Sequence, residues 1–111
     1  MANTFKNAAI AATGTSLTDA YTAGSGVTAT VIGLTCANIS STDPILVDIK
    51  FYDASANNNF FLVKQAQVYR GGALVAVGGD QKLLLETGDK IKVSSNTAAS
   101  IDTIVSVMEQ S

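Results

Sequence analysis

The sequence has 111 residues, of which 47% are hydrophobic and only 14% are charged, and its formal net charge is −2. This length predicts one domain, and the weak negative charge argues against nucleic acid as a partner, because a polyanion is bound by clustered basic residues. The sequence contains no histidine, which removes the commonest general base and the commonest metal ligand. We therefore expect a protein that is not an enzyme and that holds neither a metal nor a cofactor.

Residues 1–14 show no strand-like alternation of apolar and polar side chains. We interpret them as an N-terminal arm that docks on another protein or another copy, with residues 15–111 as the folded domain. The start of the chain lacks a basic region followed by an apolar stretch, so we expect no secretion signal and synthesis in the cytoplasm. No apolar run reaches the roughly 20 residues that span a bilayer, so we expect no membrane partner.

Several segments alternate with the period of two that is typical of β-strands. The clearest is "ILVDIKFY", residues 45–52, in which Ile45, Val47 and Ile49 share one face. The stretch Val27–Ile39 is rich in β-branched residues and apolar on both faces in its middle, as in a central strand that is covered on both sides. Further strands are predicted at residues 60–69, 73–77, 83–85, 90–95 and 100–109.

Turn residues separate these segments at intervals of about ten residues, which is typical of an antiparallel β-sandwich or barrel. The sequence therefore predicts an all-β fold, a single antiparallel β-sandwich of seven or eight strands. The pattern leaves open whether the arrangement is like a jelly roll or like an immunoglobulin domain.

The stretch "LETGDKIKVSS", residues 85–95, places a glycine, an acid and a base in succession at Gly88, Asp89 and Lys90. These residue types suit a phosphate or metal site, but they also form ordinary turns, and we interpret them as a corner between two strands. Paired carboxylates at Asp80, Glu86 and Asp89 would suit a glycosidase, yet acids beside glycines at turns are usually solvated. The single cysteine, Cys36, lies in an apolar strand and is expected to be a small buried residue.

Aromatic side chains mark a candidate contact surface. Phe60 and Phe61 are adjacent, so they point to opposite faces of a strand. We expect one of them in the core, and Phe61 together with Tyr69 at an interface with another protein. Burial of both phenylalanines within one subunit remains the alternative.

Four stretches together resemble a family of short structural proteins of tailed bacteriophages, especially those of marine and cyanobacterial phages. They are "AYTAGSGVTATVIGLTCANIS", "DPILVDIKFYDAS", "ALVAVGGDQKLLLETGDKIKVSS" and "ASIDTIVSVME". An opening of the type "TFKNA", a Val-Asp-Ile strand and a late Leu-Glu-x-Gly-Asp corner carry the similarity, which extends over nearly the whole chain. These residues belong to turns and cores, so the resemblance concerns the fold and the setting of the protein and no chemical site.

The resemblance implies a virion protein, most simply a capsid decoration or cement protein that binds and stabilises the shell of major capsid protein. It would be a homo-oligomer, with a trimer favoured, and Phe5 and Ile10 of the arm would lie on the shell. A neck or tail component, such as a collar or a fibre-anchoring ring, is the first alternative. A module that binds host glycans through Asn57, Asn58 and Asn59 is the second.

Overall fold

Most of the chain forms β-strands, in keeping with the alternation of apolar and polar side chains. The computed structural model describes residues 3–78 and 82–111. In strand β4 (Ile45–Asp53), Ile45, Val47 and Ile49 are fully buried and the residues between them lie on the more exposed face. The strand predicted from this alternation is confirmed.

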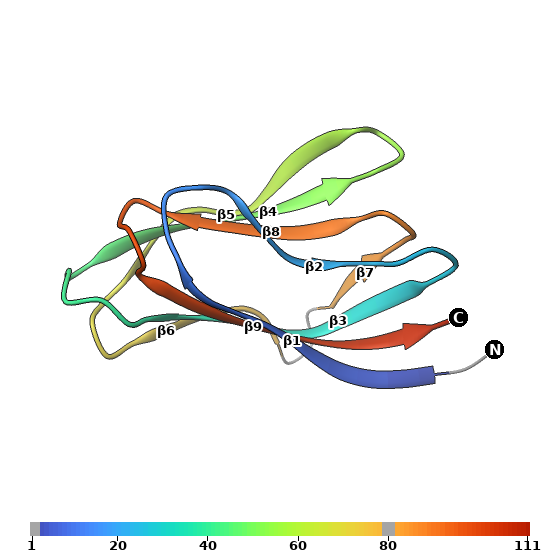
Figure 1. Ribbon diagram of the computed structural model, residues 1–111, viewed down its shortest axis with the longest axis horizontal. Helices are drawn as coiled ribbons and strands as arrows, with labels where there is room; N and C mark the ends of the chain where they lie inside the picture. The colour runs from blue at the N-terminus through green and yellow to red at the C-terminus, as the bar shows by residue number, and fades with distance from the viewer. Residues whose placement is uncertain (1–2, 79–81) are drawn as a thin grey trace.

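Within the described residues nine strands form two antiparallel sheets, which pack as the two layers of a β-sandwich (Figure 1). Sheet A has the order β1-β9-β3-β6, with β7 also paired to β3, and sheet B has the order β2-β8-β4-β5. The start of β1 and the end of β9 lie at the same end of the sandwich (Figure 1). The remaining strands are β1 (Asn3–Thr13), β2 (Thr18–Thr22), β3 (Thr28–Asn38), β5 (Asn58–Val68), β6 (Ala73–Val77), β7 (Leu83–Leu85), β8 (Lys90–Ser95) and β9 (Ile101–Gln110).

The core lies between the sheets and is built from the inward-facing residues of both layers. Leu34 of β3 and Val105 of β9 belong to sheet A, and Ile49 of β4 and Ile91 of β8 belong to sheet B; all four are fully buried. Burial of such side chains stabilises the fold by about 25 cal/mol for each Å² of apolar surface removed from water. The predicted all-β sandwich is confirmed, with nine strands where seven or eight were expected.

The prediction of an N-terminal arm at residues 1–14 is wrong for the described residues. Asn3–Thr13 forms the edge strand β1 of sheet A and pairs with β9 from Asn3 opposite Gln110 to Thr13 opposite Ile101. Its inward residues Ala8 and Ile10 pack against the core of the same subunit. Pairing with β9 makes this segment part of the fold of its own subunit, as the edge strand of sheet A, and not a separate arm.

The corner expected at residues 86–89 is confirmed. The Asp89 N–H donates to the Glu86 carbonyl at 2.9 Å, and Gly88 has a φ of 88° that most side chains avoid. Ala23 exchanges backbone hydrogen bonds with Gly88 and Asp89, which ties this corner to the segment after β2. Between the strands predicted at residues 73–77 and 83–85, the turn residues Gly79 and Asp80 lie outside the described residues.

The β4–β5 hairpin extends beyond the rest of sheet B and forms a tip at residues 54–57 (Figure 1). Its strand β5 lies at the edge of the sheet, and its register with β4 shifts on either side of Ile49. These irregularities twist the outer strand and change which β5 side chains share a face.

Candidate interaction surfaces

The Cys36 thiol, the one candidate nucleophile considered from the sequence, is buried in the core. Cys36 is fully buried, and its sulfur lies 3.6 Å from the Thr103 hydroxyl. Burial raises the pKa of the Cys36 thiol, so the reactive thiolate is disfavoured. Within residues 3–78 and 82–111, no three His, Cys, Asp or Glu side chains gather in a cluster that would hold a metal ion.

Acidic side chains at the turns act as acceptors for backbone N–H groups. Asp89 is buried, and its two carboxylate oxygens accept from the N–H groups of Ala54 and Glu86, each at 2.9 Å. Among the described residues, four further aspartates, in turns or within strands, also accept backbone hydrogen bonds: Asp43, Asp48, Asp53 and Asp102. Asp89 therefore holds the β7–β8 corner to the β4–β5 hairpin; it lies at the expected corner, but it is buried there and not solvated as expected. Asp80 lies outside the described residues.

A small polar cluster connects the two sheets where β1 and β2 meet. The Tyr21 hydroxyl of sheet B donates a short hydrogen bond to the Glu109 carboxylate of sheet A, and the Lys6 ammonium lies 3.1 Å from the same carboxylate. The hydrogen bond from Tyr21, with the charge of Lys6, lowers the pKa of Glu109. Burial, together with this hydrogen bond, raises the pKa of Tyr21. Each shift favours a neutral phenol beside an ionised carboxylate.

Replacing Glu109 with glutamine tests this cluster. A carboxyl whose pKa is lowered by folding stabilises the protein above its unfolded pKa, near 4.5, and this contribution is lost as the pH falls through the folded pKa. We expect the Glu109→Gln variant to lose about 1 kcal/mol of unfolding free energy at neutral pH and to lose less stability than the native protein on acidification. Urea unfolding between neutral pH and about pH 3 measures both, with Glu86→Gln at an exposed position as the control. If the unfolding free energies of Glu109→Gln and the native protein changed with pH in parallel, the lowered pKa of Glu109 in the folded state would be contradicted.

Large apolar side chains gather on the outward surface of sheet A. Five large side chains from five strands are exposed there, and we call them the apolar face: Phe5 of β1, Ile32 of β3, Val75 of β6, Leu84 of β7 and Ile104 of β9. Large apolar side chains that are exposed together on one surface often mark an interaction site.

Strand register places these side chains in two rows across the sheet. One row runs from Ala9 through Ile104 and Thr35 to Val75. The other runs from Phe5 through Met108 and Thr30 to Leu84. The two rows lie on either side of the polar pair formed by Asn7 and Ser106. The apolar face therefore has large apolar side chains on both sides of a polar centre.

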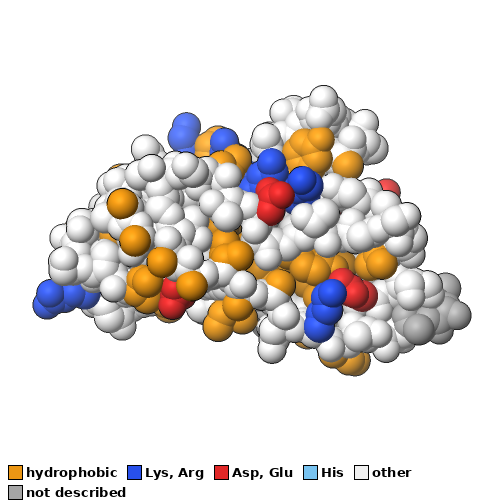
Figure 2. Space-filling view, viewed as in Figure 1, with side chains coloured by type: hydrophobic (Ala, Val, Ile, Leu, Met, Phe, Trp, Pro, Cys, Tyr) orange, Lys and Arg blue, Asp and Glu red, His pale blue; other side chains and the backbone are white. Residues whose placement is uncertain are grey.

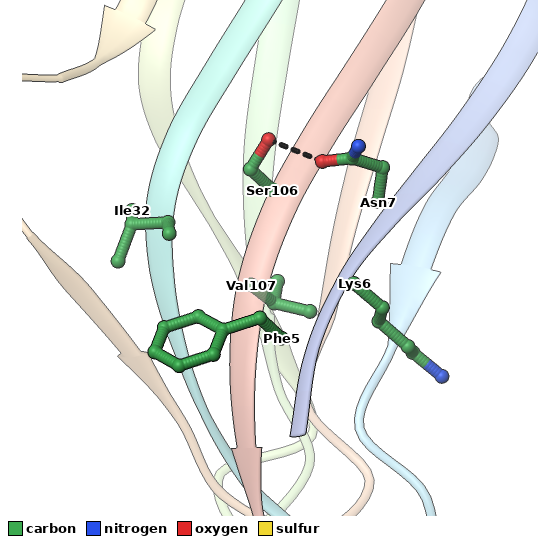
Figure 3. A pocket seen from close by; sticks show the side chains of 6 residues that line it. All are labelled: Phe5, Lys6, Asn7, Ile32, Ser106 and Val107. Carbon is green, nitrogen blue, oxygen red and sulfur yellow. Dashed lines mark hydrogen bonds between the residues drawn. The ribbon is translucent and has the colours of Figure 1, made fainter. Parts of the chain in front are cut away.

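The polar pair is Asn7 and Ser106, where the Ser106 hydroxyl donates to the Asn7 side-chain oxygen at 2.6 Å (Figure 3). Beside it the Phe5 ring lies next to Ile32, and together they border a shallow hollow of about 250 Å³ (Figure 3). The hollow opens on the apolar face and gives it relief that a protruding side chain of a neighbour can fill.

The outward surface of sheet B has a different character, because lysines and aromatic rings gather on it. We call this set the lysine face: Lys50 and Tyr52 of β4, Phe61 and Lys64 of β5, and Lys90 and Lys92 of β8. Asp19 of β2 lies at its margin, 3.2 Å from the Lys90 ammonium and 3.7 Å from that of Lys92. Figure 2 shows lysine side chains around an acidic one over the upper layer.

The two longest edge strands lie on opposite sides of the molecule. Strand β1 ends the strand order of sheet A and β5 ends that of sheet B, and β1 lies near β2 while β5 lies near β6. Exposed edge strands offer unpaired backbone groups to another chain. The molecule therefore presents one such edge on each flank.

The structure separates the four residues predicted to form an interface. Phe5 is 70% exposed on the apolar face, while Ile10 of the same strand packs against the core. Phe61 is on the lysine face and about half exposed, and Tyr69 is exposed just beyond the end of β5. Phe60 stacks on Phe51 with ring centroids 6.5 Å apart and is also about half exposed, so neither adjacent phenylalanine is fully in the core.

Sequence reasoning missed most of both faces. Ile104, Val75 and Leu84 lie in three strands that are separate in sequence, and only the pairing of these strands with β3 brings them together. One signal was present in the sequence for two of them: Ile104 and Leu84 each lie next to a buried residue of the same strand, at a position where a polar residue would be expected on a solvated face.

No helix among the described residues is long and apolar enough to cross a membrane. Neither a protein-family profile nor a curated protein matches the sequence. A solved structure with a similar fold is a chain of Bacillus endospore appendages, which form a family of disulfide-linked pili. The alignment covers 98% of this chain and 88% of that chain, with a TM-score of 0.58 and 14% sequence identity. At this identity the similarity shows a shared β-sandwich fold.

Proposed function

We propose that this protein is a structural subunit of a multi-copy assembly and that copies of it pack against one another through the apolar face. The observation that supports the proposal is the exposure of Phe5, Val75 and Ile104 on one surface of sheet A, beside a core that is already complete. A stable interface typically buries about 800 Å² on each partner, and the molecule measures 45 × 26 × 23 Å, so one face of the sandwich is large enough.

The resemblance to tailed-phage proteins suggests a virion as the assembly. In that setting the subunit is a capsid decoration protein that forms oligomers, trimers being favoured, on the major capsid shell. Adding contacts that exist only in the assembled shell stabilises the shell. Hundreds of copies per particle, counted by quantitative gel, would support a shell protein, whereas a few copies would support a neck or tail component.

A fibre is the second candidate, and the two long edge strands favour it. Because β1 and β5 lie on opposite flanks, a contact between β1 of one copy and β5 of the next is head to tail. Repeated contacts of this kind generate an open filament, unless the rotation between successive copies closes them into a ring. The pilus protein of similar fold is consistent with such a use of the sandwich. A disulfide-linked fibre is not part of the proposal, since Cys36 is the only cysteine and is fully buried.

Replacing Ile104 with lysine tests the proposed self-association. Ile104 is 51% exposed in one row of the apolar face, so a charge there opposes packing against a second copy without disturbing the core. We expect the native protein to form oligomers in sedimentation velocity experiments at increasing concentration, and Ile104→Lys to remain a folded monomer under the same conditions.

Thr22→Lys is the matched control, because it adds the same charge at an exposed position of β2 in the other sheet. It should associate like the native protein. Electron microscopy of the associated species separates closed oligomers from open fibres. A native protein that stays monomeric at high concentration would refute the proposal.

A further inference from the structure

Four of the chain's six lysines lie on one surface of sheet B. Lys92 of β8 is directly opposite Lys50 of β4, which is in turn opposite Phe61 of β5. In the next row Lys90 is opposite Tyr52, and Tyr52 is opposite Asn59. Because directly opposed residues of adjacent strands have Cβ atoms about 5 Å apart, the lysines form one compact cationic group.

Like charges directly opposite one another on adjacent strands destabilise a sheet, so the Lys50 and Lys92 pair is unfavourable for the isolated subunit. Two acids share this surface. Asp19 contacts Lys90 and Lys92 at its margin, and Asp48 accepts a hydrogen bond from the Gln65 backbone. Four lysines against two aspartates give the lysine face a positive charge, although the whole chain has a formal charge of −2. An anionic partner would relieve this repulsion.

Ammonium groups lie over the aromatic rings of the lysine face. Lys50 and Lys64 lie 4.8 Å and 5.3 Å from the centre of the Phe61 ring. Lys90 and Lys92 lie 6.0 Å and 5.1 Å from the centre of the Tyr52 ring. Single-stranded nucleic acids bind largely by stacking bases on aromatic rings, and here a base would compete with the ammonium groups for the ring faces. The arrangement instead favours a ligand that is recognised by its charge.

Amide and hydroxyl groups surround the lysines and give the face a hydrogen-bonding capacity that suits sugar hydroxyls. Thr22 of β2 is opposite Lys90, and Ser94 of β8 is opposite Asp48. Asn57 and Asn59 of the projecting hairpin continue the Tyr52 row, with the Tyr52 hydroxyl donating to the Asn57 side-chain oxygen at 2.7 Å. Lysines also suit such a ligand, because they bind carboxylate and sulfate as point charges without the planar geometry that arginine imposes.

We propose that the lysine face binds an acidic polysaccharide, with Lys50, Lys90 and Lys92 contacting its carboxylate or sulfate groups and the Asn57–Asn59 segment contacting its hydroxyls. This binding is independent of self-association, because the lysine face is on sheet B and the apolar face is on sheet A. A subunit of an assembly would thereby keep one surface for its neighbours and one for an acidic glycan.

The test is binding of the native protein to polygalacturonate and to dextran sulfate, measured by biolayer interferometry at low and at physiological ionic strength. We expect binding to at least one of these polymers, weakened by salt because exposed charges are screened over about 8 Å at physiological ionic strength. We expect no binding to neutral dextran. The double variant Lys50→Gln/Lys92→Gln should bind about tenfold more weakly, while Lys50→Arg/Lys92→Arg should retain binding.

The variant Lys6→Gln/Arg70→Gln is the control, because it changes the net charge of the chain equally and leaves the lysine face intact. It should bind like the native protein. Circular dichroism and thermal unfolding should show that all variants are folded, and Lys50→Gln/Lys92→Gln should still self-associate. The proposal is overturned if neither acidic polysaccharide binds, if Lys50→Gln/Lys92→Gln binds as tightly as the native protein, or if oligo(dT) or polyglutamate of similar charge binds equally well.

Discussion

Replacing Leu34 with alanine should lower the free energy of unfolding by about 3 to 4 kcal/mol. Leu34 is fully buried in the middle of β3, where it faces sheet B and is opposite Val105 and Val77 of the neighbouring strands. The substitution removes buried apolar surface and leaves a cavity, since side chains on both sides are fixed by their own strands. Urea unfolding followed by far-ultraviolet circular dichroism measures the loss.

Leu84→Ala is the matched control, because it makes the same chemical change at a position of β7 that is 57% exposed. It should change the free energy of unfolding of the monomer by less than about 0.5 kcal/mol. It should instead weaken self-association, because Leu84 belongs to the apolar face. Equal losses of monomer stability in the two variants would contradict the division of apolar residues between core and face.

The second large effect is expected at Asp89. Removing its carboxylate by Asp89→Ala leaves the N–H groups of Ala54 and Glu86 without their acceptors, in a part of the structure where Asp89 itself is only 5% exposed. Each lost acceptor costs about 1 to 2 kcal/mol, so we expect a loss of about 2 to 3 kcal/mol in unfolding free energy. The corner and the hairpin tip should also become faster in hydrogen exchange.

Asp43→Ala provides the comparison, since Asp43 is exposed and accepts one backbone hydrogen bond, from Arg70. Its loss should be below about 1 kcal/mol. If Asp89→Ala were no more destabilising than Asp43→Ala, the corner would not depend on the buried carboxylate. Residues 88–90 would then be better explained as a phosphate or metal site than as a structural corner.

The strands were predictable where the period of two separates a buried from a solvated face. Strand β4 is the best example, because Asp48 and Lys50 alternate with Ile45, Val47 and Ile49. Strand β1 was missed because its inward residues Ala8 and Ile10 are only half-buried and its outward residues include further alanines. An edge strand of small residues has little contrast between its faces, and its pairing partner β9 lies at the far end of the chain.

The surfaces were much less predictable, because they depend on the register of strands that are far apart in sequence. No short window is basic, yet Lys50 and Lys92 face each other across two adjacent strands. Irregular pairing adds to the difficulty, because the register of β5 shifts twice against β4. The regular alternation that would place Phe61 and Tyr69 on the same face is therefore interrupted. Such shifts follow from tertiary packing and leave little trace in local sequence.

The low charge of the chain has a structural counterpart in the apolar face. Leu84, Val75 and Ile104 occupy outward positions of sheet A at which a solitary sandwich would carry polar residues. The described charged groups lie mainly on the lysine face, in turns, and in the Tyr21 and Glu109 cluster. This segregation is what an assembly subunit with one buried and one solvated face requires.

A reconstruction of the assembled species by cryo-electron microscopy tests the central claim most directly, because it shows which surface of each subunit is covered. The account predicts that Phe5, Val75 and Ile104 lie within van der Waals contact of a neighbouring copy in every subunit, with the lysine face open to solvent. An assembly in which the outer surface of sheet A faces solvent, and the copies touch through other surfaces, would contradict it.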